Sequence, residues 1–147
     1  MGFFDLFRKK PAQDRYAREK EIARAPDVKK RLSLAKSTNT HQEILYYLAQ
    51  HDPEPEVRLA VARNRAMPIH ASPVLAGDTN EDVRLALAER LVLLLPDLPP
   101  DRHSQLFAFA AQALGTLALD EVLKIRKALA STLKDYAHTP PKIANQL

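Results

Sequence analysis

The chain has 147 residues and no cysteine, and its 22 Lys or Arg against 18 Asp or Glu give a net charge of +4. This length fits one domain with a single core or one continuous stack of elements. Without cysteine, the chain can form neither disulfides nor thiolate sites for zinc or iron–sulfur clusters, and it has no cysteine nucleophile. We therefore expect a protein of the reducing cytoplasm.

The positive charge is concentrated near the N-terminus. Residues 1–31 hold ten Lys or Arg against five Asp or Glu, whereas residues 32–147 hold twelve against thirteen. A nucleic-acid groove normally needs a concentrated basic stripe, because phosphate neutralisation supplies most of the nonspecific affinity. The balanced part after residue 31 therefore favours a protein partner, and nucleic-acid binding through the basic N-terminal region is the alternative.

Residues 1–11 form an N-terminal arm in this interpretation. As a short helix it would place four apolar side chains on one face, next to three cations, which would give weak and reversible attachment to an anionic membrane surface. A disordered arm, or one docked on the first repeat, is the other reading. The residues proposed for membrane contact are Phe3, Phe4, Leu6, Phe7, Arg8, Lys9 and Lys10. The longest nearly apolar stretch, residues 106–119, is too short to span a bilayer.

Two prolines bound the next segment. Pro11 and Pro26 enclose a charged helix over residues 12–25, which has few apolar residues and is expected to be solvated or only partly docked. A helix over residues 27–36 follows. Thr40 is then expected to cap a helix, with Glu43 three residues later completing a capping box.

One phrase recurs in the remainder: Asp, four residues, Val or Ile, Arg, any residue, Ala, Leu or Val, and Ala. A phrase recurring at intervals of a few tens of residues is typical of stacked helical repeats, and helices apolar on more than one side suit an inner layer. The run over residues 91–95 is so apolar that we expect it to be buried. The copies begin at Asp52, Asp78 and Asp120, and their arginines are Arg58, Arg84 and Arg126.

These residues resemble known repeat families. The run over residues 57–64, followed by Met67-Pro68 and by residues 75–78, resembles the leucine-rich repeat variant and HEAT-like units of bacteria. The third copy, with Thr139-Pro140-Pro141, is similar to an uncharacterised bacterial family of longer HEAT-like proteins. The resemblance implies an all-α fold, a right-handed α-solenoid of about eight helices, whose usual use is protein binding.

The resulting domain organisation has three parts. The arm covers residues 1–11, the charged helix residues 12–26, and the repeat domain residues 27–147. Because the chain stops where another phrase would be due, we expect the repeat domain to be truncated at its C-terminal end.

The recurring Asp and Arg have two interpretations. They can form a structural ladder, in which each Asp caps a helix and each Arg clasps the Asp of its own or a neighbouring copy. Alternatively, the arginines form a stripe that binds a partner. The six residues of either arrangement are Asp52, Arg58, Asp78, Arg84, Asp120 and Arg126.

No arrangement typical of catalysis is present in the sequence. The five histidines do not show metal-ligand spacing, and with three glycines no phosphate-cradling loop can be written. The segment from His41 to Ile44 faintly resembles the phosphoacceptor box of sensor kinases. We therefore expect no catalytic residues, metal or cofactor, and a scaffold rather than an enzyme.

Overall fold

The computed structural model describes residues 11–97 and 104–134, with the backbone alone described for residues 131–134. The prediction of an all-α chain is confirmed for this part, which contains eight α-helices and two 3-10 helices and no strand. The elements are α1 (Pro11–Arg24), α2 (Val28–Lys36), α3 (Gln42–His51), α4 (Pro55–Arg63), η2 (Ile69–Ala71), α5 (Ser72–Ala76), α6 (Glu81–Leu94), η3 (Leu95–Asp97), α7 (Gln105–Ala118) and α8 (Leu123–Lys134).

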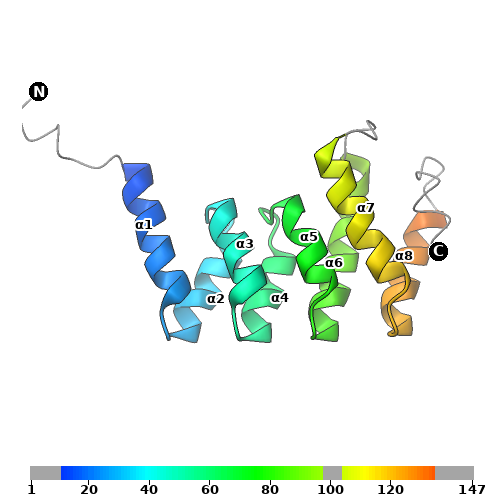
Figure 1. Cartoon of the computed structure of the whole chain (residues 1–147), viewed down its shortest axis with the longest axis horizontal. Coiled ribbons are helices and arrows are strands. Elements are labelled where there is room, and N and C mark those ends of the chain that lie inside the picture. The colour runs from blue at the N-terminus through cyan, green and yellow to red at the C-terminus, as the bar shows by residue number, and fades with distance from the viewer. Residues whose placement is uncertain (1–10, 98–103, 135–147) are drawn as a thin grey trace, which may run out of the picture.

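The helices lie in two rows (Figure 1). We call α1, α3, α5 and α7 the first row, and α2, α4, α6 and α8 the second row. Each second-row helix packs against the first-row helix that precedes it, and α2, α4 and α6 also pack against the second-row helix of the next pair. The described chain is therefore a series of helical hairpins arranged in sequence order.

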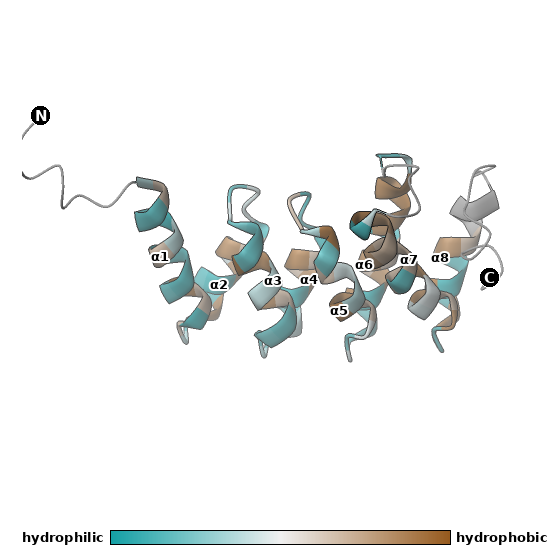
Figure 2. Ribbon diagram, turned by 45° about the horizontal axis from the view of Figure 1, so that its top comes forward, coloured by the Kyte–Doolittle hydropathy of each residue, from teal (hydrophilic) through white to brown (hydrophobic). Residues whose placement is uncertain are grey.

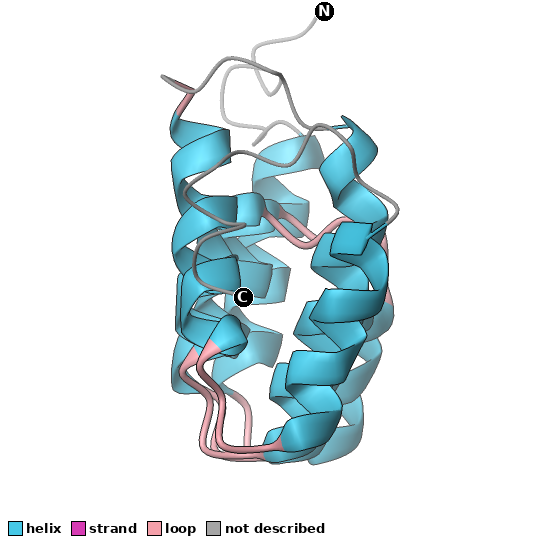
Figure 3. Cartoon of the chain, turned by 90° about the vertical axis from the view of Figure 1, so that its right-hand side faces the viewer, coloured by secondary structure: helices cyan, strands magenta, loops and turns pink. Residues whose placement is uncertain are grey.

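Seen along the length of the molecule, the two rows form separate layers joined by short loops that overlie one another at one end (Figure 3). These loops connect each first-row helix to its second-row partner. They are the segments in which the recurring aspartates lie. The repetition of the sequence thus becomes a repetition of loops along one edge.

The phrase supplies the core of the second row. Its Val or Ile is fully buried in each copy, as Val57, Val83 and Ile125. The alanines that follow the arginine in the phrase have small side chains, so neighbouring helix axes can approach closely. Ala62 and Ala88 are 0% exposed and belong to helices that pack against the next second-row helix.

The charged helix over residues 12–25 is observed as α1, which starts one residue earlier, at Pro11. It packs against α2 and α3. Ala23 joins the core, and Tyr16 and Ile22 pack on its edge. Most of the surface of α1 is hydrophilic (Figure 2), which agrees with the expected partial docking.

The expected capping box at Thr40 is wrong. Helix α3 has His41 as its N-cap, without a side-chain hydrogen bond, and the Thr40 hydroxyl instead donates to the carbonyl of Leu34 at 2.6 Å. The carboxylate of Glu19, from α1, accepts from the backbone N–H of His41 at 3.1 Å. The capping anion thus comes from another helix, which local spacing could not predict.

The expected burial of residues 91–95 is confirmed only in part, since Val92 and Leu95 are partly buried against the core. Leu91 is buried, but Leu93 is 67% exposed. The physical reason is length, since α6 has 14 residues and α4 has nine, so the last turn of α6 extends past its neighbour. Hydrophobic residues continue to the upper ends of α6 and α7 in Figure 2.

Candidate functional site

The guanidinium of the recurring arginine forms hydrogen bonds to two successive hairpins. Arg58 donates from Nε to Oδ2 of Asp78 at 2.7 Å and from Nη2 to Oδ1 of the same carboxylate at 3.2 Å. Its Nη1 donates to the backbone carbonyl of Asp52 at 2.8 Å. Arg58 therefore binds the backbone of its own copy and the carboxylate of the next copy.

The next copy repeats this geometry. Arg84 pairs with Asp120, the aspartate of the following copy, with Nε–Oδ2 at 2.7 Å and Nη2–Oδ1 at 3.3 Å. Its Nη1 donates to the carbonyl of Asp78 at 2.8 Å. A bidentate guanidinium–carboxylate pair is a strong and directional form of ion pair, so it fixes the spacing of successive hairpins.

The structure also contains a copy of the phrase that the sequence interpretation missed. Arg31 pairs with Asp52 at 2.8 Å, and its Nη1 donates to the carbonyl of Ala25 at 2.6 Å. Ala25 thus occupies the position of the aspartate. The signal was present in Arg31, Leu34 and Ala35, which keep the phrase spacing, but the missing Asp hid it.

The aspartates order the loops rather than the first turns of the helices. The carboxylates of Asp52, Asp78 and Asp120 each accept from the backbone N–H two residues later, at 2.9 Å. The N-cap residues of α4 and α6 are Glu54 and Asn80. The expectation that each Asp caps a helix is therefore wrong for α4 and α6, whose N-cap residues lie two positions after the Asp.

Burial and electrostatics separate the ladder from an open binding stripe. The side chains of Arg58 and Arg84 are 13% and 12% exposed, and their carboxylate partners are 5% exposed. Burial opposes ionisation of Asp120, but hydrogen bonds from Arg84 and from a backbone N–H, with the charges of Arg84 and Arg126, outweigh it and lower the pKa of Asp120. The hydrogen bond to Asp120 correspondingly raises the pKa of Arg84. The guanidinium groups of Arg58 and Arg84 therefore bind the neighbouring hairpin and do not form an open stripe for a partner.

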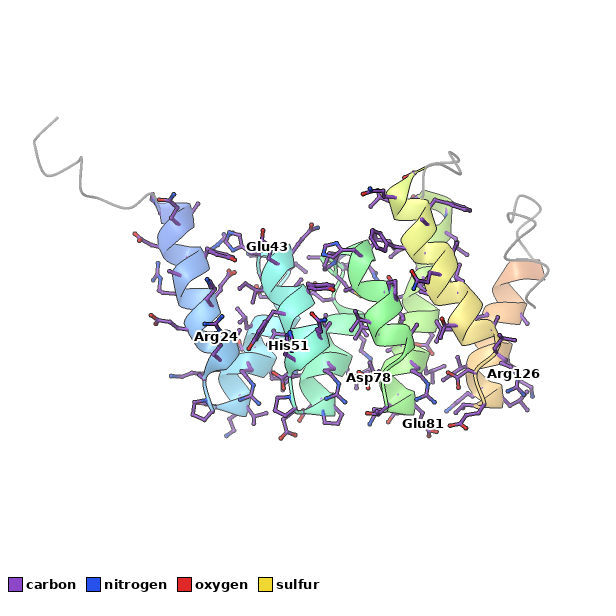
Figure 4. All side chains as sticks on the ribbon, in the orientation of Figure 1. Arg24, Glu43, His51, Asp78, Glu81 and Arg126 are labelled. Carbon is purple, nitrogen blue, oxygen red and sulfur yellow. The ribbon has the colours of Figure 1, made fainter. Side chains whose placement is uncertain are left out.

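Arg126 differs from the other arginines. Its Nη1 donates to the carbonyl of Asp120, as the repeat geometry requires. No carboxylate among the described residues pairs with its Nε and Nη2 edge. It lies at the far end of the second row, past Asp78 along the same edge (Figure 4).

The outward face of the second row carries a row of leucines. Leu32, Leu59 and Leu85 occupy the same position of successive copies, and all three are half-buried. Leu32 and Leu59 line a shallow groove of about 260 Å³ between α2 and α4. Charged side chains border this groove, namely Lys36, Glu56 and Arg63.

A second groove, of about 250 Å³, lies between α1 and α3. Tyr16 and Tyr47 line it together with Lys20 and Arg24. Each cation lies over a tyrosine ring, at 5.4 Å for Lys20 over Tyr16 and 5.9 Å for Arg24 over Tyr47. The hydrogen bond from the Tyr16 hydroxyl to Glu43, at 2.7 Å, raises the pKa of Tyr16.

The histidines have structural partners where they are described. His41 Nδ1 lies 2.6 Å from the Glu19 carboxylate, and the rings of His51 and His70 pack on Tyr47 and Tyr46. In residues 11–97 and 104–134, no group of three His, Asp or Glu is placed to hold a metal ion. The phosphoacceptor-like segment starts at His41, whose ring is engaged with Glu19.

The proposed membrane contacts, Phe3, Phe4, Leu6, Phe7, Arg8, Lys9 and Lys10, lie outside the described residues, as does the segment with Thr139 and the two prolines. None of the helices in the described ranges has both the length and the apolar character needed to cross a bilayer. The membrane interpretation therefore remains a prediction.

Comparison with known proteins gives no match to a family model, to a curated protein or to a solved structure. The resemblance to HEAT-like and leucine-rich repeat variant units thus remains a prediction from the sequence.

Proposed function

We propose that this protein is a non-catalytic scaffold, an α-solenoid of HEAT-like hairpins that binds another protein along the outward face of its second row. The observation that carries the proposal is the row of leucines. Leu32, Leu59 and Leu85 are only partly buried at equivalent positions, although the other apolar residues of the phrase are buried in the copies that begin at Asp52 and Asp78. A row of apolar side chains bordered by charges is the usual composition of a protein-binding groove.

The charges on this face indicate the polarity of the partner. The exposed ends of α2 carry Lys29 and Lys36, and the corresponding positions of α6 carry Asp82 and Glu89. A segment that lies across the row would therefore be acidic where it contacts α2 and basic where it contacts α6. Such complementarity favours one direction of binding and increases the association rate.

The wider biological setting is part of the same proposal. A scaffold role fits a chain without cysteine and without catalytic or phosphate-cradling motifs in its sequence. We place the protein in the bacterial cytoplasm, held loosely at the inner face of the membrane through residues 1–11. Removal of these residues should release the protein from anionic vesicles without changing partner binding.

The test is capture from native lysate with the full chain as bait, with and without nuclease. Arg63→Glu reverses an exposed charge in the groove, and Leu59→Glu places a charge in the leucine row. We expect a discrete protein that survives nuclease and is lost or reduced at least tenfold with both variants. Gln50→Glu, on the exposed surface of α3, is the matched control and should not change capture.

Two results would contradict the proposal. One is capture that is unchanged in Arg63→Glu and Leu59→Glu. The other is material that disappears with nuclease treatment, which would favour the alternative function.

The alternative is a nucleic-acid-binding HEAT-like domain that uses the basic N-terminal region. The specific observation behind it is the groove between α1 and α3, where cations lie over tyrosine rings that bases could stack on. Further exposed cations, Arg15 and Arg18, lie on the same helix. Binding of a single-stranded oligonucleotide should then fall steeply with added salt and weaken in Arg24→Ala; affinity independent of salt would exclude it.

A further inference from the structure

Each hairpin presents a forward face to the hairpin that follows it. On the second-row helix this face contains the arginine and, four residues later, the last alanine of the phrase. Ala35, Ala62 and Ala88 hold this alanine position in α2, α4 and α6, and all three are 0% exposed. Because each of these helices packs on the next second-row helix and each arginine binds the next aspartate, the following hairpin is what covers the forward face.

The forward face of α8 has the same residues but no such cover among the described residues. Ala130, at the alanine position, is exposed. Leu123, on the same stripe one turn before Arg126, is 53% exposed, and Leu119 in the preceding loop is 76% exposed. Arg126 donates from Nη1 to the backbone carbonyl of Asp120, as Arg58 and Arg84 do to their own copies, and in those two arginines Nε binds the next carboxylate.

The opposite end of the row is built differently. Ala25 stands where an incoming arginine would need an aspartate. The surface groove at this end is lined by side chains from α1, α2 and the loop after α2, among them Arg15, Lys30 and Asn39. A second copy stacked head to tail would therefore offer the Arg126 edge no carboxylate at the required position.

We propose that the forward face of α8 is a docking surface for a helical hairpin of another protein, one whose second helix follows an aspartate. The aspartate would accept from Nε and Nη2 of Arg126, and a small or apolar stretch of the helix after it would cover Ala130 and Leu123. Three interfaces within this chain supply the pattern for the contact. This site lies at the end of the row and is independent of the leucine row on its outward face.

The absence of native cysteine allows a direct first test. In the purified full chain, Ala130→Cys should react with maleimide at nearly the rate of a free peptide thiol, at every protein concentration. Ala88→Cys, at the buried equivalent position, is the matched control and should react at least a hundredfold more slowly. Protection of the thiol at position 130 at all concentrations would mean that the chain covers its own face, and protection that grows with concentration would mean self-association; either would overturn the proposal.

The second test identifies the occupant. Benzophenone maleimide attached to the Ala130→Cys variant is photolysed in native lysate, and the crosslinked peptide is sequenced. We expect one predominant protein, joined within a few residues of an aspartate that precedes a helix, and at least a tenfold loss when Arg126→Met is added. Arg63→Glu should leave this crosslink unchanged, which separates it from binding at the outward face. A crosslink that survives Arg126→Met, or no discrete product, would refute the proposal.

Discussion

Arg31, Arg58 and Arg84 each use one nitrogen for a backbone carbonyl of their own copy and two for the next carboxylate. The first bond holds the side chain of Arg58 against the loop at Asp52, and the second reaches Asp78. A guanidinium held in this way loses little further freedom when the carboxylate arrives, which strengthens the pair. The ion pairs therefore act as spacers between hairpins rather than as isolated surface pairs.

The ion pair of Arg84 with Asp120 should make the stability of the protein depend on pH. Its pKa is lowered in the folded protein, mainly because hydrogen bonds and the charge of Arg84 outweigh its burial. In acid the unfolded chain therefore binds more protons at this position than the folded chain, so stability falls as pH falls below the ordinary Asp pKa of about 3.9. This contribution is complete at neutral pH and is lost as pH falls through the lowered pKa.

The expected result for Asp120→Asn is a loss of about 1–3 kcal/mol at pH 7, because a charged hydrogen-bond partner is removed. The difference from the natural chain should shrink between pH 5 and pH 3. Urea unfolding at several pH values measures both quantities, with Asp82→Asn, an exposed carboxylate on α6, as the control. A difference that stays constant or widens in acid would contradict the assigned role.

Among the helices, close packing of the second row depends on alanine at one position of the phrase. Ala62 is fully buried on α4, which packs against α6, whereas Ala130 is exposed on α8. Ala62→Leu should cost about 1–3 kcal/mol, because three added carbons have to force the helices apart. Ala130→Leu should stay within about 0.5 kcal/mol.

Chemical denaturation followed by helix circular dichroism gives both values. The two substitutions add the same atoms to the same position of the phrase, so each controls for the helix propensity of the other. Equal costs would show that the forward face of α8 is already filled in the free protein.

The docking of α1 depends on Glu19. Its carboxylate is 9% exposed and accepts from the backbone N–H of His41 while lying 2.6 Å from Nδ1 of the same residue. Glu19→Ala should destabilise the protein by about 1.5–3 kcal/mol and speed amide exchange most at α1 and the start of α3. Glu21→Ala, which changes an exposed residue of the same helix, is the control. Amide exchange that increases uniformly over the chain would contradict a local role of Glu19 in docking α1 on α3.

The sequence allowed these helices to be predicted where the phrase repeats. The second-row helices α4, α6 and α8 follow from their spacing of apolar residues, because three copies constrain one pattern. The capping of α3 could not be predicted, since Glu19 lies 22 residues away in the chain. Local capping rules favoured Thr40 because they contain no information about an adjacent helix.

The choice of ladder partner also could not be made from the sequence. Arg58 is six residues from Asp52 and 20 from Asp78, and both spacings are compatible with an ion pair in stacked hairpins. Only the packing of α4 against α6 decides for the carboxylate of Asp78. The row of half-exposed leucines was missed for a similar reason, because an apolar residue in a helix that packs on several sides is expected to be buried.

Across the whole molecule, the hairpins make contacts mainly with their neighbours in sequence. In such an arrangement stability is close to a sum of hairpin terms and interface terms. Loss of one interface should therefore lower the total stability by about the term of that interface.

Arg31, Arg58 and Arg84 each couple their hairpin to the following one. A double-mutant cycle on Arg58→Met with Asp78→Asn tests this coupling most directly, compared with a cycle on Arg58→Met with Asp52→Asn. We expect a coupling free energy of about 1.5 kcal/mol or more for Arg58 with Asp78, and less than half of that for Arg58 with Asp52. Equal couplings, or a larger coupling to Asp52, would show that Arg58 stabilises its own hairpin rather than the junction with the next one.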